Sequence, residues 1–142
     1  MKAAISIALV LLMAVSSVSQ QDSRSETTLA RSISRDEAAS LLRAFLRSEG
    51  YDTKAAPLDI EDSADSPDSG FYLLAVFVDT PQRLVKIGNY GVNGGTGDIW
   101  NLVECKRVTS SAIASKQKQI RESSGLSPTE LNRLHKSNPP CF

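Results

Sequence analysis

The chain has 142 residues, two cysteines, one histidine and a formal net charge of zero. This length suits one domain, and the balanced charge argues against a dedicated nucleic-acid-binding protein. A single histidine excludes sites built on two, and two cysteines cannot complete a cysteine-only zinc site within one chain. With 41% hydrophobic and 23% charged residues, most of the chain is expected to fold.

Residues 1–19 have the pattern of a secretory signal peptide. Lys2 provides the basic start, residues 3–15 are apolar except for Ser6, and the small residues Ser17 and Ser19 fit a cleavage site before Gln20. The apolar run is shorter than the roughly 20 residues that a membrane-spanning helix needs. We therefore expect cleavage, no stable membrane insertion, and an exported protein, either periplasmic or secreted. The alternative is an uncleaved anchor.

Residues 20–33 are polar and have no periodic apolar face, which predicts a flexible lead-in, and residues 34–142 are expected to form a single α+β domain. Ser34 and Glu37 have the spacing of a capping box, which predicts the start of a helix. Gly50 is suited to end that helix. Its buried stripe comprises Ala38, Leu41, Leu42 and Phe45.

Residues 57–70 are acidic and interrupted by turn-forming residues. A short edge strand at 58–60 is expected to lead into a solvated loop. The acidic residues are Asp59, Glu61, Asp62, Asp65 and Asp68. They raise the alternative of a calcium site, but the spacing of an EF-hand loop is absent, and a plain acidic loop is favoured.

Three further segments predict strands: 71–79, 84–92 and 98–105. The Asn-Gly-rich residues 93–97 between the last two predict a hairpin turn. No lysine follows these glycines, and they lie between strands, so a phosphate-binding loop is disfavoured. We expect the first helix to pack on a three- to four-stranded antiparallel meander.

After Cys105 the pattern becomes helical, and residues 106–142 are expected to form a basic two-helix tail. One helix begins at Ser110 or Ser111 and ends near Ser123, and a second begins at Ser127 with Pro128 and Glu130 in its first turn. Leu131 and Leu134 are expected to face inward. In an exported protein, Cys105 and Cys141 are expected to form a disulfide that staples this tail.

The neutral total charge conceals a division at Cys105. Residues 20–105 contain 8 basic and 14 acidic residues, whereas residues 106–142 contain 7 basic and 2 acidic ones. The basic segment could steer a partner, or it could pack on the acidic body so that the charges offset each other. The candidate partner-binding residues are Lys106, Arg107, Lys116, Lys118, Arg121, Tyr90 and Trp100.

The sequence predicts no catalytic, cofactor-binding or metal-binding residues. His135 lies among basic residues of a late helix, where a lone histidine is more often inert than catalytic. Glu61 and Asp62 could act as an acid–base pair in glycoside hydrolysis, but their loop position favours a solvated surface.

The opening S-R-D-E-A-A of the helix and the hairpin V-N-G-G-T-G-D-I-W resemble the PepSY-like family of small secreted α+β domains. The resemblance covers about residues 34–103 and includes Thr96, Gly97 and Asp98. The layout also resembles bacterial immunity and inhibitor proteins. These resemblances imply a binding module without chemistry of its own, which could inhibit an envelope or extracellular hydrolase. The alternatives are a small envelope enzyme that uses carboxylates, and a structural envelope protein.

Overall fold

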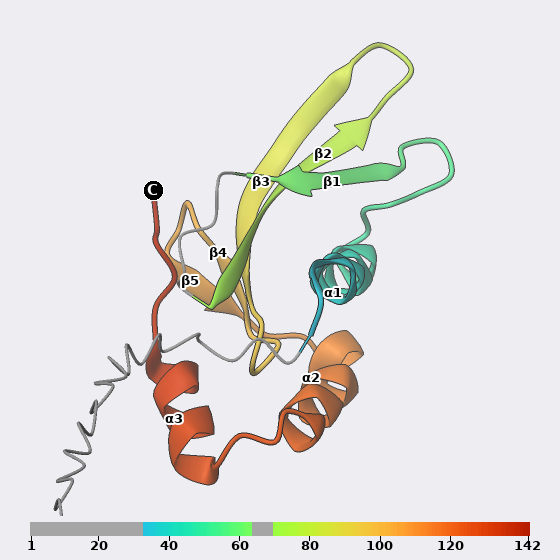
Figure 1. Ribbon diagram of the computed structural model, residues 1–142. Helices are drawn as coiled ribbons and strands as arrows, with labels where there is room; N and C mark the ends of the chain where they lie inside the picture. The colour runs from blue at the N-terminus through green and yellow to red at the C-terminus, as the bar shows by residue number, and fades with distance from the viewer. Residues whose placement is uncertain (1–32, 64–69) are drawn as a thin grey trace, which may run out of the picture.

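The computed structural model describes residues 33–63 and 70–142, in which helices pack on one antiparallel sheet (Figure 1). The predicted signal peptide, residues 20–32 of the lead-in, and Asp65 and Asp68 lie outside the described residues. In chain order the elements are α1 (Arg35–Ser48), β1 (Leu58–Asp62), β2 (Phe71–Asp79), β3 (Leu84–Asn93), β4 (Ile99–Asn101), β5 (Lys106–Val108), α2 (Ser111–Ser123) and α3 (Pro128–Lys136). The predicted α+β class is confirmed.

Helix α1 begins and ends at the residues that the sequence indicates. The Ser34 hydroxyl accepts a hydrogen bond from the Glu37 amide, and the Glu37 carboxylate accepts one from the Ser34 amide. The hydrogen bonds of Ser34 hold the pKa of Glu37 below its usual value. Gly50 follows the helix with a φ of 89°, a left-handed conformation that favours glycine.

The five strands form an antiparallel meander in sequential order, β1-β2-β3-β4-β5. The register between β2 and β3 shifts at Val76 and Phe77, which pair with Gly88 and Lys86. Ile87 is therefore the extra residue of a β-bulge.

The fifth strand corrects the prediction of a three- to four-stranded sheet. The predicted strand 98–105 ends at Asn101 because the Asn101 side-chain oxygen accepts hydrogen bonds from the amides of Val103 and Glu104. This turn reverses the chain, and β5 then pairs with β4. Residues 106–108, predicted as the start of the helical tail, belong to the sheet.

The larger hydrophobic cluster lies between α1 and one face of the sheet. The buried stripe of α1 packs there on Leu74, Val76, Val92 and Ile99, and Ile113 of α2 closes one end. On the opposite face, a smaller cluster contains Phe71, Leu73, Trp100 and Leu102. The C-terminal segment crosses this second face, because a Cβ added to Gly91 would lie 3.3 Å from the Pro139 Cβ atom.

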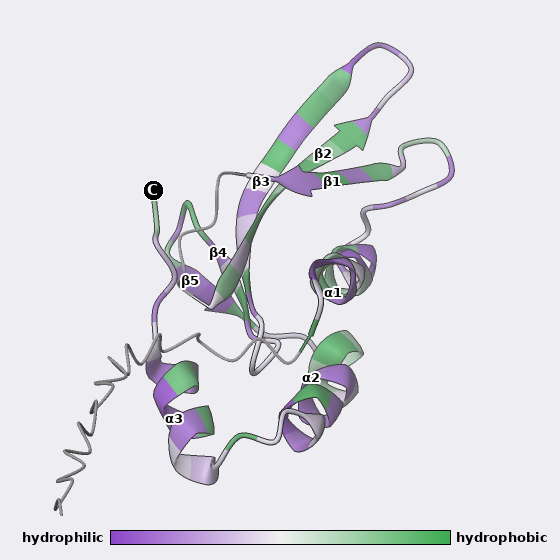
Figure 2. Cartoon of the chain, viewed as in Figure 1, coloured by the Kyte–Doolittle hydropathy of each residue, from purple (hydrophilic) through white to green (hydrophobic). Residues whose placement is uncertain are grey.

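Helices α2 and α3 are the shorter, more polar pair, and many of their residues are hydrophilic (Figure 2). Ser127, Pro128 and Glu130 form the predicted start of α3 with a complete capping box. Leu134 is buried, whereas Leu131 is only partly so. The predicted disulfide joins Cys105 in the β4–β5 turn to Cys141, with their Cα atoms 5.5 Å apart. Within the described ranges, none of the helices has the length and hydrophobicity to cross a membrane.

Asp52 fastens the end of α1 to the start of β1. Its side chain is only 6% exposed and accepts hydrogen bonds from the Leu58 amide, Arg43 and Arg47. Burial by itself would raise the pKa of Asp52, but the Leu58 amide and the two guanidinium groups outweigh it and hold this pKa below its usual value. The charged carboxylate therefore stabilises the fold at neutral pH.

We expect Asp52→Asn to lower the free energy of unfolding by about 1–2 kcal/mol at pH 7. Because the folded-state pKa is depressed, the contribution is complete above the unfolded pKa of about 3.9 and disappears as the pH falls through the folded value. Urea denaturation at pH 7 and at pH 3 should show the difference from wild type shrinking in acid. Asp59→Asn, on the exposed side of β1, is the matched control. A difference that stayed constant with pH would contradict this role.

Candidate functional site

Among the residues that the structure describes, the buried polar side chains gather at the turn between β3 and β4. Asn93, Thr96 and Asp98 are each no more than 5% exposed. The Asn93 side-chain oxygen accepts hydrogen bonds from the amides of Gly95 and Thr96. Gly97 adopts a φ of 71°, which suits a residue without a side chain. The Asn-Gly-rich sequence thus builds a closed turn whose side chains point into the protein.

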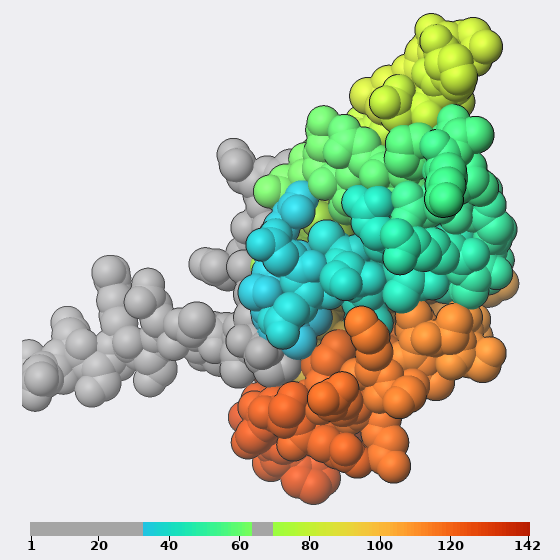
Figure 3. All heavy atoms as spheres, turned by 90° about the vertical axis from the view of Figure 1, so that its right-hand side faces the viewer, coloured from blue at the N-terminus to red at the C-terminus, as the bar shows by residue number. Residues whose placement is uncertain are grey.

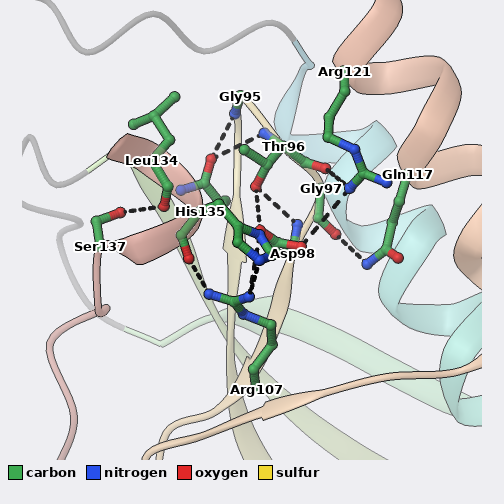
Figure 4. A network of polar contacts seen from close by, with 11 residues as sticks. Gly95, Thr96, Gly97, Asp98, Arg107, Gln117, Arg121, Leu134, His135 and Ser137 are labelled. Atoms are coloured by element: carbon green, nitrogen blue, oxygen red, sulfur yellow. Dashed lines mark hydrogen bonds and ion pairs between the residues drawn. The ribbon is translucent and has the colours of Figure 1, made fainter. Parts of the chain in front are cut away.

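The Asp98 carboxylate collects contacts from the turn and from both C-terminal helices (Figure 4). It accepts a hydrogen bond from the Thr96 hydroxyl at 2.8 Å and lies 2.9 Å from the His135 Nδ1 atom. Arg121 of α2 approaches its other oxygen at 3.9 Å and donates to the Thr96 carbonyl at 3.3 Å. We call Thr96, Asp98, Arg107, Arg121 and His135 the Asp98 cluster.

Arg107 closes the cluster on the strand side. Its Nη1 atom lies 2.6 Å from the His135 Nε2 atom, and its guanidinium also donates to the His135 carbonyl. Since the Nδ1 atom faces the Asp98 carboxylate and the Nε2 atom faces a guanidinium, we assign the tautomer in which Nδ1 carries the proton. The same guanidinium lies 5.1 Å from the centre of the Trp100 ring, a cation–π contact.

Asp98 and His135 are arranged like two members of a catalytic triad, but no hydroxyl or thiol nucleophile of a described residue faces the histidine. In a triad, the histidine nitrogen remote from the carboxylate faces a hydroxyl or thiol nucleophile. Here that nitrogen faces Arg107, and the nearby Thr96 hydroxyl is fully buried and donates to Asp98 instead. The contacts therefore support a structural role, in which the Asp98 cluster holds the turn, β5, α2 and α3 together.

The turn also fixes the position of α2 beside α1. Gln117 donates to the Gly97 carbonyl at 2.9 Å. A Cβ atom added at Gly97 would lie 2.8 Å from Ile120 and 3.3 Å from Leu41, so the turn contacts side chains of both helices. The glycine at this position thus permits the close approach of α2 and α1.

A groove of about 250 Å³ runs between α1 and α2. Figure 3 shows the two helices side by side on the face of the molecule that is turned to the viewer. The floor of the groove contains the apolar residues Ile33, Leu41 and Ile120. Its polar lining comprises Glu37 and Ser40 from α1, with Lys116, Gln119 and Ser123 from α2.

The seven predicted partner-binding residues do not form one patch. Arg107, Trp100 and Arg121 belong to or contact the Asp98 cluster, and Trp100 is buried. Lys118 points away from the groove and lies 3.8 Å from Glu122. Lys116 lines the groove, and Lys106 is exposed on β5.

Tyr90 is placed apart from these cations. Its ring lies on the α1 side of the sheet and meets the Phe45 ring edge-on, with the centroids 6.4 Å apart. Burial raises the pKa of the Tyr90 hydroxyl, and the nearby groups of Tyr51, Glu104 and Glu49 add to this effect. Tyr90 therefore packs at the edge of the core, and the prediction that it binds a partner stays a prediction.

The carboxylates considered for acid–base chemistry lie on the exposed end of β1. Glu61 is exposed, and Asp62 is bonded to Arg35 at 3.0 Å. In the part of the chain that the structure describes, no three His, Cys, Asp or Glu side chains are placed to hold a metal ion. Two members of the predicted acidic loop, Asp65 and Asp68, lie outside that part.

The sequence did not predict the groove or the contacts that form the Asp98 cluster. A signal for the groove was present, because residues 116, 119, 120 and 123 have the spacing of one helix face. No comparable signal joins Asp98 to His135, which are 37 residues apart in the chain.

Comparison with solved structures finds a similar fold in a chain from a type VI secretion system effector–immunity complex of Pseudomonas protegens. The TM-score is 0.59, the sequence identity is 22%, and the match covers 73% of this chain and 87% of that chain. At this identity the likeness shows the fold alone. No protein-family model matches the chain, so the PepSY-like resemblance stays a prediction. No curated protein matches it either.

Proposed function

We propose that the protein is an immunity-type binding protein, which binds a protein effector and blocks its activity. One observation carries the proposal: the fold is shared with a chain of an effector–immunity complex over 87% of that chain. The sequence resemblance to immunity and inhibitor proteins points in the same direction. The proposed target is a hydrolase of the envelope or the extracellular space.

The chemistry of the Asp98 cluster supports the immunity side of such a pair rather than the effector side. His135 is held between Asp98 and Arg107, so both of its ring nitrogens contact protein groups. The cluster joins four segments of the chain, and this suits a rigid binding surface. A rigid surface loses less conformational entropy when it binds a partner.

We also propose that the protein is exported, to the periplasm or outside the cell. The disulfide between Cys105 and Cys141 supports this compartment, since disulfides persist mainly in oxidising environments. The signal-peptide pattern of residues 1–19 supports it independently. A tagged protein should therefore appear in the periplasmic fraction or the medium, with the first 19 residues removed.

The binding function is tested by capture from an envelope extract, followed by reconstitution. The tagged protein should retain one effector protein, and the purified pair should run as a stable stoichiometric complex in size-exclusion chromatography. Failure of every captured protein to bind again after purification would contradict the proposal. Turnover of peptidoglycan or a glycan by the protein itself, lost in Glu61→Gln or Asp62→Asn, would instead establish the carboxylate enzyme.

A further inference from the structure

We infer that the groove between α1 and α2 receives an acidic–apolar segment of the effector, namely an apolar side chain with a neighbouring carboxylate. This inference rests on the proposed function and names the surface and the chemistry through which it would operate. The groove is the binding feature, and Lys116 is the residue that selects for the carboxylate.

The size of the groove favours a side chain over a small molecule. Pockets for drug-sized ligands usually have volumes of roughly 300–1,000 Å³, whereas this groove has about 250 Å³. Protein interfaces often depend on a few anchor side chains that fill pockets of the partner. The buried side chains of Ile33 and Leu41 offer such an anchor an apolar floor.

The floor is held in a fixed position before any partner arrives. The Ile33 amide donates to the Gly94 carbonyl at 3.1 Å, and the Tyr72 hydroxyl donates to the Ile33 carbonyl at 2.7 Å. On the other side, the turn at Gly97 contacts both Leu41 and Ile120. Because the walls are already ordered, an entering side chain should not have to organise them.

The charged and polar side chains around the groove favour a carboxylate next to the partner's apolar side chain. Lys116 is exposed and makes no ion pair or hydrogen bond with another described residue, and the amide of Gln119 adds further donors on the same wall. One oxygen of the Glu37 carboxylate, on the α1 wall, accepts hydrogen bonds from the amide and hydroxyl of Ser34. A carboxylate from the partner is therefore complementary to the α2 wall, with the apolar side chain directed into the floor.

Three other cations of residues 106–142 contact groups outside the groove. Arg121 and Arg107 are bonded within the Asp98 cluster, and Lys118 lies beside Glu122 on the outer side of α2. Lys118 therefore provides a matched control for Lys116. The two residues lie on the same helix and have the same charge, but only Lys116 lines the groove.

The test uses two capped tetrapeptides, acetyl-Gly-Asp-Leu-Gly-amide and acetyl-Gly-Lys-Leu-Gly-amide, titrated into the isotope-labelled full protein and followed by NMR. We expect the aspartate peptide to shift the signals of the groove residues and to bind about three- to tenfold more tightly than the lysine peptide. Lys116→Glu should reverse this preference, whereas Lys118→Glu should leave it unchanged. Equal responses to both peptides, or no shift in the groove, would overturn the inference.

Two other occupants of the groove are distinguished by two further measurements. If groove signals move with protein concentration and Lys116→Glu abolishes a dimer, the groove joins two copies of the chain. If the peptide binds only after removal of the residues that precede Ile33, those residues occupy the groove. Either result overturns the inference.

Binding of the captured effector to the variants tests this inference separately from the proposed function. An effector that binds wild type and Lys116→Glu equally well leaves the proposed function standing and overturns the role of the groove. A selective loss of affinity in Lys116→Glu, absent in Lys118→Glu, supports both. If no effector binds the protein, both proposals fail.

Discussion

The double variant Cys105→Ser/Cys141→Ser is expected to be less stable than the wild type by about 3–4 kcal/mol. The disulfide joins residues 36 apart in the sequence, and in the chain-entropy model it restricts the unfolded chain by closing a loop of that length. The closed loop contains β5 and both C-terminal helices. Denaturant unfolding followed by circular dichroism measures the loss.

The part of the fold that loses stability can be identified as well as the size of the loss. Loss of the disulfide should loosen the last residues first, since Pro139 and Cys141 tie them to the second face of the sheet. Amide hydrogen exchange should therefore increase in α3 before it increases in α1. Wild type treated with a dithiol reductant should reproduce the variant. A stability change under 1 kcal/mol, or free thiols in the untreated protein, would contradict this account.

Asp98→Ala is expected to cost about 2–4 kcal/mol of unfolding free energy. The substitution leaves the fully buried Thr96 hydroxyl without its acceptor and removes the carboxylate that His135 and Arg121 approach. A buried donor that loses its partner is expensive because water cannot replace it. Thermal and urea unfolding should both report the loss.

Two comparisons make the Asp98 prediction specific. Glu104→Ala removes an exposed carboxylate in the next turn and should change stability by less than about 0.5 kcal/mol. In a double-mutant cycle, Asp98→Ala and His135→Ala should be non-additive, because the two side chains are in direct contact. Additive losses would show that the hydrogen bond between them contributes nothing measurable.

Local sequence signals predicted the elements whose causes are local. The capping residues Ser34 and Ser127 start α1 and α3 as expected, and Gly50 follows α1 in the left-handed conformation that suits it. The apolar segments 71–79 and 84–92 became the two long strands of the meander. In each case a few neighbouring residues determine the backbone conformation.

The error at residues 98–105 shows where such signals fail. The alternating pattern continues past Asn101, but its side chain bonds the amides of Val103 and Glu104 and ends the strand. Asparagine favours both turns and loops, so composition alone did not locate the reversal. The extra strand β5 follows directly from it.

The structure also shows where the acidic and basic parts of the chain, divided at Cys105, meet. Within the described residues, one ion pair joins the acidic body to the later basic segment, between Asp98 and Arg121 at 3.9 Å, and His135 forms a hydrogen bond with the same carboxylate. The charges therefore offset each other at one buried carboxylate rather than across a broad surface. The sequence alone could not predict which basic residues remain available to a partner. Their availability depends on contacts between residues far apart in the chain.

We propose that this protein blocks an effector by binding it. The most direct measurement is a titration of the captured, purified effector with the protein while the effector's activity is followed. We predict that the activity falls linearly and disappears near a molar ratio of one, and that Lys116→Glu shifts the curve to higher protein concentrations whereas Lys118→Glu does not. Full effector activity in the presence of excess wild-type protein would contradict the account.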